Sequence, residues 1–184
     1  FLSGGATLKG FGKAAGIPAG TWASGGSLNT ARYGSGSSGI TQNASLAFTG
    51  SNGTANVANN ESYNGTSWTE LTDVNTARSN TAGTGSQTAA LLFGGTTGSV
   101  TNATEKWDGT SWTEVNNLNT ARRYLASAGT QTAALAFGGY VPSPGKLAVN
   151  ESWDGTSWTE VADLNTSRYG PGGAGVQTSA VAFG

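Results

Sequence analysis

Histidine and cysteine are both absent from this chain of 184 residues. Without histidine the chain lacks the usual general base and the commonest metal ligand, and Ser-His-Asp or Cys-His catalytic arrangements are excluded. Without cysteine, neither a disulfide nor a thiolate metal site can form, so the sequence favours neither an oxidising nor a reducing compartment. The sequence therefore predicts no metal site and no cofactor.

Charge is also scarce, with 10% charged residues and a net charge of -1. No broad electrostatic field exists to attract a polyanion, so we expect no nucleic-acid binding. No apolar run approaches the roughly 18 residues of a membrane span, so we expect no membrane insertion. The chain begins at Phe1 rather than Met, and we expect it to be processed or incomplete.

The abundant residues are of a different kind: 30 Gly and six Trp, with many Ser, Thr and Asn. This composition favours short strands, many turns and a core anchored by a few large aromatic side chains. A repeat of about 45 residues runs through the chain. Four markers share its period: Trp22, Trp68, Trp112 and Trp158; Arg32, Arg78, Arg122 and Arg168; Gln42, Gln87, Gln131 and Gln177; and Phe48, Phe93, Phe137 and Phe183.

One unit is predicted to contain four short strands. Residues 125–129 and 132–137 flank a Gly-Thr turn, and residues 150–153 and 157–161 flank Asp154-Gly155, a dipeptide that favours a tight hairpin. Four antiparallel strands repeated at this period are typical of propeller blades, each of which needs a neighbour to bury its faces. We therefore predict an all-β fold, a β-propeller of about four four-stranded blades with partial blades at both ends.

The repeats resemble the kelch family in three features: a double Gly after an apolar strand, an aromatic in the third strand (Tyr63, Trp107, Trp153) and a Trp in the fourth. The resemblance spans residues 21–184. Residues 1–20 lack the Asn-Glu-Ser-aromatic segment and are interpreted as a degenerate segment or partial blade. The sequence is compatible with three arrangements of the ring. The chain is part of a longer one with more blades, or it forms a four-bladed ring closed by residues 1–26, or two chains form an eight-bladed ring.

The repeated polar and aromatic residues are interpreted as structural. Glu61, Glu105 and Glu151 share one repeat position, whereas a catalytic pair of carboxylates needs two different environments. The four repeated Arg residues are expected to bridge carbonyls or a Glu of the neighbouring blade, the alternative being a ring for an anionic ligand. The four repeated Trp residues are expected to wedge between blades, the alternative being sugar stacking.

Recognition is predicted where the units differ. Alternation of strand direction places the loops between second and third strands on the same face as the Asn-Thr-Ala-Arg linkers. Variable loops on a fixed scaffold are where binding is expected. The candidate contacts on these loops are Tyr140, Lys146, Asn52, Asn56 and Thr97.

The sequence segments that recur in the repeats are similar to those of kelch-like repeat proteins of marine bacteriophages. Examples are Asp-Gly-Thr-Ser-Trp-Thr-Glu-Val and Gly-Thr-Gln-Thr-Ala-Ala-Leu-Ala-Phe-Gly-Gly. The resemblance implies a non-catalytic virion or extracellular surface module, in a fibre, tail or capsid decoration. Its expected partners are other virion proteins, host-surface glycans or proteins, or further copies of the chain. The alternative is a lectin-like carbohydrate-binding propeller, and a hydrolase is disfavoured by the missing His.

Overall fold

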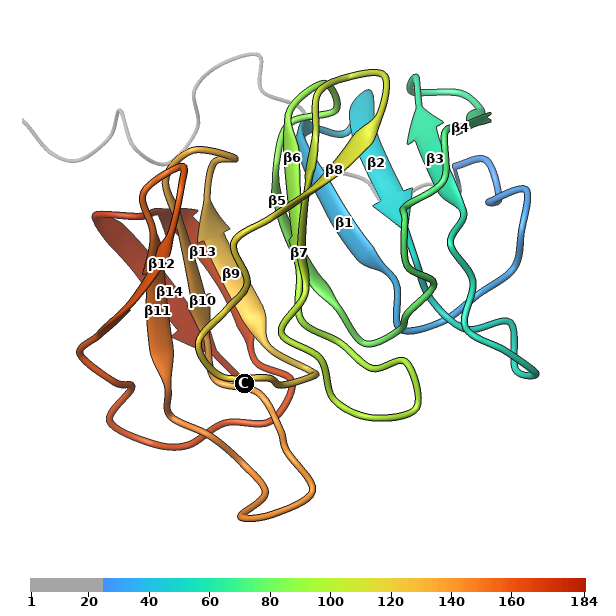
Figure 1. Ribbon diagram of the computed structural model, residues 1–184. Helices are drawn as coiled ribbons and strands as arrows, with labels where there is room; N and C mark the ends of the chain where they lie inside the picture. The colour runs from blue at the N-terminus through green and yellow to red at the C-terminus, as the bar shows by residue number, and fades with distance from the viewer. Residues whose placement is uncertain (1–24) are drawn as a thin grey trace, which may run out of the picture.

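The computed structural model describes residues 25–184, and its architecture is entirely β (Figure 1). No helix occurs in these residues, so none of them forms a helix able to cross a membrane. The predictions made for residues 1–20 and for Trp22 lie outside the described residues.

Fourteen strands form three four-stranded antiparallel sheets and one two-stranded sheet, each in simple sequential order. The first blade contains β1 (Gly36–Thr41), β2 (Ala44–Phe48), β3 (Asn60–Tyr63) and β4 (Trp68–Leu71). The second contains β5 (Ala82–Gly85), β6 (Ala90–Phe93), β7 (Thr104–Trp107) and β8 (Trp112–Val115). The third contains β9 (Ala126–Gly129), β10 (Ala134–Phe137), β11 (Asn150–Trp153) and β12 (Trp158–Val161). The last sheet contains β13 (Gly172–Val176) and β14 (Ser179–Phe183).

The tight turn between third and fourth strands shows how local sequence sets the hairpin register. In the second blade, Asp108 Oδ1 accepts hydrogen bonds from the backbone N–H groups of Thr110 and Ser111, both at 2.8 Å. Gly109 adopts a φ of 97°, a conformation that a residue with a Cβ rarely adopts. Trp107 is thereby paired directly with Trp112 across the strands.

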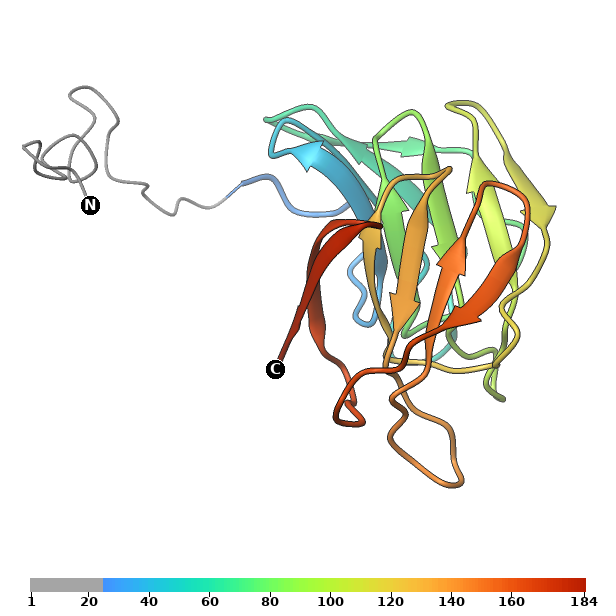
Figure 2. The same cartoon turned by 90° about the vertical axis from the view of Figure 1, so that its left-hand side faces the viewer.

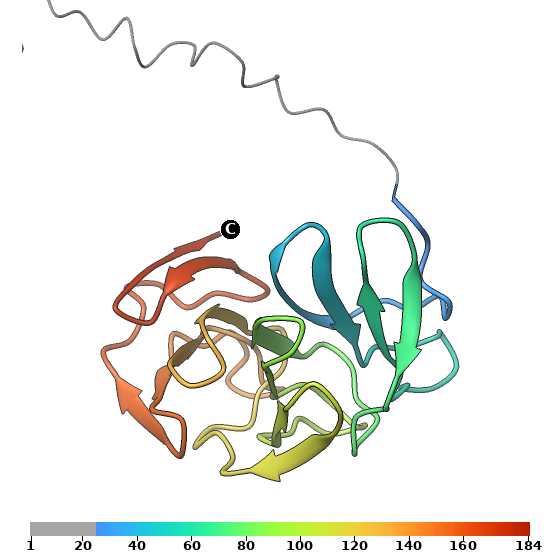
Figure 3. The same ribbon diagram turned by 90° about the horizontal axis from the view of Figure 1, so that it is seen from above.

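The blades are arranged around a central axis (Figure 3). The first strand of each blade is innermost: β5 packs on β1 and on β9, and β9 packs on β13. The fourth strands β4, β8 and β12 lie at the rim, while tight turns and longer loops occupy opposite ends of the axis (Figures 1 and 2). This arrangement is that of a propeller.

Three hydrophobic clusters lie between successive blades and form the core. The cluster between the first and second blades contains Leu46, Phe48, Leu92, Trp107 and Trp112. The next contains Leu91, Phe93, Ala136, Trp153 and Trp158. The third, against β13 and β14, contains Ala126, Ala128 and Phe137, with Leu135, Leu164 and Ala182 packed beside them. Because each cluster needs two blades, no blade holds a complete core alone.

The predicted all-β fold of four-stranded antiparallel blades is confirmed: three blades are complete and the fourth is partial. The ring is not closed within residues 25–184, since β14 pairs with β13 alone.

Candidate functional site

The linkers between blades and the loops between second and third strands lie together, and we call the surface they form the long-loop face. Isolated antiparallel bridges join them in each blade: Tyr33 to Ser51, Ser79 to Thr96, and Arg123 to Tyr140. The longest of these loops, between β10 and β11, projects beyond the others (Figure 2). This face is therefore built on a hydrogen-bonded framework that recurs from blade to blade.

A chain of backbone hydrogen bonds connects successive linkers on this face. The N–H of Asn80 donates to Gly34 O, that of Tyr124 to Asn80 O, and that of Gly170 to Tyr124 O, at 2.6, 3.0 and 2.9 Å. All four residues have a left-handed φ between 55° and 62°. Such a φ costs a bulky residue about 1–2 kcal/mol, and Tyr124 adopts it nonetheless.

Tyr124 belongs to an exposed aromatic group, which we call the tyrosine cluster: Tyr124, Tyr140 and Tyr169 together with Arg123. The rings of Tyr124 and Tyr169 lie 4.7 Å apart, and Tyr140 meets Tyr169 edge-on at 5.6 Å. Tyr169 is 50% exposed, while the others are half-buried. Tyr124 and Tyr169 come from successive linkers and Tyr140 from the long loop, so the third blade and the linker that follows it assemble the cluster.

Arg123 gives the tyrosine cluster its positive charge. Its guanidinium carbon lies 5.2 Å from the ring centre of Tyr124 and 5.4 Å from that of Tyr140, both within cation-π range. Its Nε atom is buried without a hydrogen-bond partner among the described residues. Hydrogen bonding with the Tyr124 side chain, followed by burial, raises the pKa of the Tyr169 hydroxyl. The cluster thus offers aromatic faces, hydroxyl groups and one cation.

The predicted recognition residues divide into two groups. Tyr140 lies in the tyrosine cluster, and the exposed Lys146 is bridged to it across the loop. The other three are apart from the cluster, in the first and second blades. Asn52 caps its own loop by accepting from the N–H of Thr54 and Ala55, and Asn56 donates to Thr96 O at 2.9 Å. Thr97 is exposed at its loop tip.

Arg123, Tyr124 and Tyr169 were not predicted as site residues. A signal was present, because Tyr124 stands where the other repeats have Gly34, Asn80 and Gly170. A large aromatic at a position otherwise occupied by residues that tolerate positive φ is unusual. What the repeat pattern does not show is that two linkers and one loop bring these side chains into contact.

Three of the four repeated arginines are buried in ion pairs. Three pairs have side chains that are 0% exposed: Arg32 with Glu61, Arg78 with Glu105, and Arg122 with Glu151. In the first pair Arg32 Nη1 lies 2.5 Å from Glu61 Oε1, and in the second the 2.8 Å contact is off the hydrogen-bonding direction. Each Glu belongs to the blade that the linker enters, not to the neighbouring blade as expected, because the linker crosses the end of its own third strand.

Burial and ion pairing shift the pKa values of these groups in opposite directions. Burial lowers the pKa of Arg78 and Arg122, and the adjacent carboxylates oppose that shift, so both remain charged. For Glu61, burial acts to raise the pKa, but donation from the Asn29 N–H, Arg32 and the Thr30 N–H outweighs it and lowers the pKa overall. The groups serve the blade and leave no free charge for a ligand.

The described tryptophans of the fourth strands lie in or beside the cores between blades. Trp112 meets Phe48 of the preceding blade edge-on at 5.2 Å, and Trp158 meets Phe93 in the same way at 4.9 Å. Trp68 is half-buried and stacks on Tyr63 within its own blade. The buried indoles of Trp112 and Trp158 offer no face for sugar stacking.

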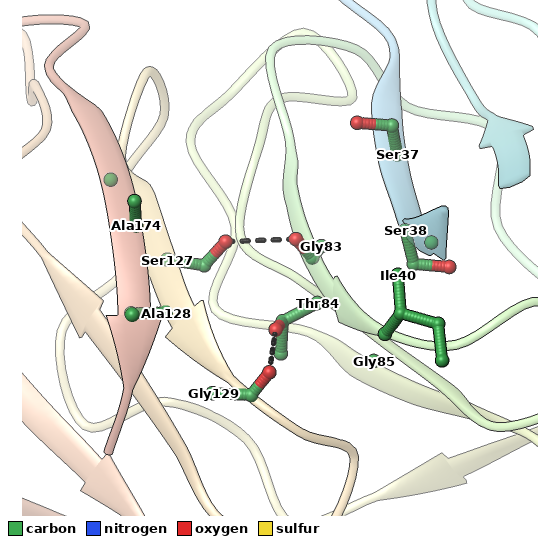
Figure 4. Close-up of a pocket in the computed structure, with 13 residues that line it drawn as sticks. Ser37, Ser38, Ile40, Gly83, Thr84, Gly85, Ser127, Ala128, Gly129 and Ala174 are labelled. Carbon is green, nitrogen blue, oxygen red and sulfur yellow. Dashed lines mark hydrogen bonds between the residues drawn. The ribbon is translucent and has the colours of Figure 1, made fainter. Parts of the chain in front are cut away.

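A cavity of about 330 Å³ runs along the axis between the innermost strands (Figure 4). Its lining carries no charged residue, and two of its hydroxyl groups are already used: Ser127 Oγ donates to Gly83 O at 2.8 Å and Thr84 Oγ1 to Gly129 O at 2.7 Å. We interpret it as a structural feature of the axis. The described residues also contain no group of three His, Cys, Asp or Glu side chains able to hold a metal.

Fold and site together define a propeller-like protein whose most distinctive surface is an aromatic cluster on the long-loop face. Neither a scan against protein-family models nor a search of the curated proteins gives a match for this chain.

Proposed function

We propose that this chain is a non-catalytic binding module of a bacteriophage virion surface, in a fibre, tail or capsid decoration. The virion setting rests on the resemblance of its repeats to kelch-like proteins of marine bacteriophages. On this proposal it binds a host surface or another virion protein through the long-loop face. The observation that carries the binding role is the tyrosine cluster, which occurs in one blade and has no counterpart in the other complete blades.

The cluster has the properties of a recognition surface. Tyrosine provides large, rigid and amphipathic contact area, and an arginine held over the rings is the other residue type enriched in binding hot spots. Tyr124 keeps a strained backbone conformation at the centre of the cluster. Strain of this kind is concentrated at functional sites.

The experiment compares the wild-type chain with a variant in which each tyrosine takes the residue of the second blade: Tyr124→Asn, Tyr140→Thr and Tyr169→Ser, after Asn80, Thr96 and Ser79. The fluorescently labelled chains are incubated with a panel of marine bacterial cells and with purified phage particles. We expect the wild type to bind at least one of these and the variant to lose that binding.

A matched control is available on the same face. Tyr33 is 63% exposed and occupies the repeat position of Tyr169, but it lies in the first blade. Tyr33→Ser makes the same chemical change as Tyr169→Ser away from the cluster, and it should leave binding intact. Equal losses in both variants would refute a localised site.

A lectin-like role is the second candidate, because exposed tyrosines and hydroxyls also suit sugars. The cluster is not repeated, so this candidate requires one sugar per chain rather than one per blade. A glycan array followed by titration of any hit would establish the stoichiometry. Binding to the array that the triple variant loses would favour the lectin over binding to a virion protein.

A further inference from the structure

Negative charge is kept away from the loops of the long-loop face. The loops between second and third strands, residues 49–59, 94–103 and 138–149, contain no Asp or Glu, and neither does the linker that enters the third blade, residues 116–125. The ten carboxylates lie in buried third strands (Glu61, Glu105, Glu151), on fourth strands (Glu70, Glu114, Glu160), in the tight turns of the opposite face (Asp108, Asp154) and just after fourth strands (Asp73, Asp163). An anionic ligand is therefore not repelled by these loops.

Two cations lie together on this face in the third blade. Arg123 in the linker and Lys146 on the long loop are both joined to Tyr140 by antiparallel bridges. Lys146 is exposed and Arg123 is half-buried, and no described carboxylate forms an ion pair with either side chain. The Arg123 guanidinium is held between the rings of Tyr124 and Tyr140, so its position is set by aromatic side chains rather than by an acid.

The main chain of the tyrosine cluster offers little to a peptide. Arg123 and Tyr140 exchange both of their backbone hydrogen bonds, at 3.1 and 2.7 Å. The N–H of Tyr124 donates to Asn80 O, and its carbonyl accepts from the Gly170 N–H. Recognition of an extended peptide by strand addition needs free main-chain donors and acceptors, and here they are already in use. A ligand of the cluster is therefore recognised by side chains.

The side chains present fit one kind of ligand, a sugar ring that bears a carboxylate. A planar guanidinium can donate two parallel hydrogen bonds to a carboxylate. Tyrosine rings cover the apolar C–H face of a sugar, and their hydroxyls bond to its hydroxyl groups. With only two cations on this part of the face, the arrangement suits a single carboxylate better than a densely charged polyanion.

We propose that the tyrosine cluster binds a uronic acid unit of an acidic polysaccharide. Arg123 binds the carboxylate, Tyr124 and Tyr140 contact the ring and its hydroxyls, and Lys146 supplies a second positive charge from across the loop. This inference rests on the proposed function, because it names the class of ligand taken by the same surface.

The test uses a matched pair of probes, trigalacturonate and its fully methyl-esterified form, which differ only in the charge of the carboxyl groups. Each is titrated into the whole chain and followed by calorimetry and by amide chemical shifts. We expect the acid to bind saturably, one per chain, with the largest shifts at Arg123, Tyr140 and Lys146. The ester should bind about tenfold more weakly or less, because the charge-assisted hydrogen bonds to Arg123 are lost.

Variants of single cations locate the site. Arg123→Ser introduces the residue of the second blade, Ser79, and should bind acid and ester alike. Lys106→Gln is the matched control, since it removes a positive charge from the half-buried Lys106 of β7 and should leave the preference for the acid intact. The comparison of acid with ester in the wild type needs no variant, so it tests the proposal even if Arg123→Ser fails to fold.

Equal binding of acid and ester to the wild type, or binding of neither, overturns the proposal. It is also overturned if a polyglutamate peptide binds as tightly as the sugar and Arg123→Ser abolishes that binding, since the occupant would then be a protein.

These failures are distinguishable from failure of the proposed function. A cell or phage particle whose binding requires the three tyrosines but not Arg123 supports the proposed function and overturns this ligand class. Uronate binding that depends on Arg123, with no binding to any cell or particle, supports the ligand class and refutes the virion-surface role.

Discussion

Arg122 and Glu151, 29 residues apart in sequence, form an ion pair inside the third blade in which both side chains are 0% exposed. The same guanidinium donates to Ala136 O at 2.8 Å, so one side chain joins the linker to both the second and the third strand. The first blade is closed in the same way, since Arg32 donates to Glu61 and to Ala47 O, whereas in the second blade Arg78 lies 2.8 Å from Glu105 without a hydrogen bond.

Removing one member of the pair should destabilise the chain strongly. Glu151→Ala leaves a buried cation without its carboxylate, and we expect a loss of about 3–5 kcal/mol in the free energy of unfolding. The double variant Arg122→Met with Glu151→Leu should recover most of that loss, since it removes both charges. Urea denaturation measures both. A Glu151→Ala variant within about 1 kcal/mol of wild type would contradict the structural role.

Arg168→Met is the matched control for that measurement. Because this arginine has no described carboxylate, its loss should change the free energy of unfolding by less than about 1 kcal/mol.

Acid should destabilise the protein through carboxyl groups whose pKa is lowered in the folded state. Backbone N–H groups lower the pKa of Asp108 and Asp154 in their turns, and hydrogen bonds lower that of Glu61 against the opposing effect of burial. The unfolded chain therefore binds more protons as pH falls through the usual carboxyl range. Stability should be fully present at pH 7, fall below about pH 5, and be lost progressively through the lowered pKa values.

Urea midpoints at a series of pH values test this, with Asp108→Asn and Asp154→Asn in one chain as the comparison. That variant should show a shallower acid slope than the wild type. A midpoint independent of pH between 7 and 3 would contradict the prediction.

Trp112 should contribute much of the stability between the first two blades. It is 5% exposed and packs edge-on against Phe48. Trp112→Ala should cost about 3–5 kcal/mol, as truncations of large core aromatics do. Trp112→Phe should cost less than Trp158→Phe, because the Trp112 indole N–H has no partner whereas that of Trp158 donates to Thr104 Oγ1 at 3.2 Å. Thermal unfolding of the three variants measures the order.

Tyr124→Asn should separate binding from stability. Asn80 occupies the equivalent position with a φ of 57°, so asparagine suits this backbone conformation. Relief of the backbone strain and removal of the ring packing are each worth about 1 kcal/mol in opposite directions, so the free energy of unfolding should stay within about 1 kcal/mol of wild type. Binding to the target found with the wild-type chain should fall at least tenfold. Retained binding would place recognition elsewhere on the surface.

The blade could be predicted from sequence because its signals are local. The Asp-Gly turn and the paired aromatics around it give a third strand at residues 150–153, which is the span of β11. The first strand of that blade was predicted from residue 125, but Leu125 lies before β9 and packs into the core between blades. The sequence does not distinguish an apolar residue that begins a strand from one that precedes the strand and packs into the core between blades.

The tyrosine cluster could not be predicted in the same way. Tyr124 and Tyr169 stand one repeat apart with an offset of one residue, and their contact arises only because the linkers of adjacent blades are hydrogen-bonded through Tyr124 and Gly170.

The backbone hydrogen bonds between the left-handed linker residues hold the blades together independently of the side chains that those residues present to solvent. These bonds use main-chain atoms alone, and the residue holding each of them is Gly34, Asn80, Tyr124 or Gly170. A newly duplicated blade can therefore keep its attachment to its neighbours when the side chain at this position changes, provided that the new residue tolerates the left-handed backbone conformation as Asn80 and Tyr124 do. Divergence after duplication can then change the surface chemistry of a single blade while the repeated scaffold is preserved.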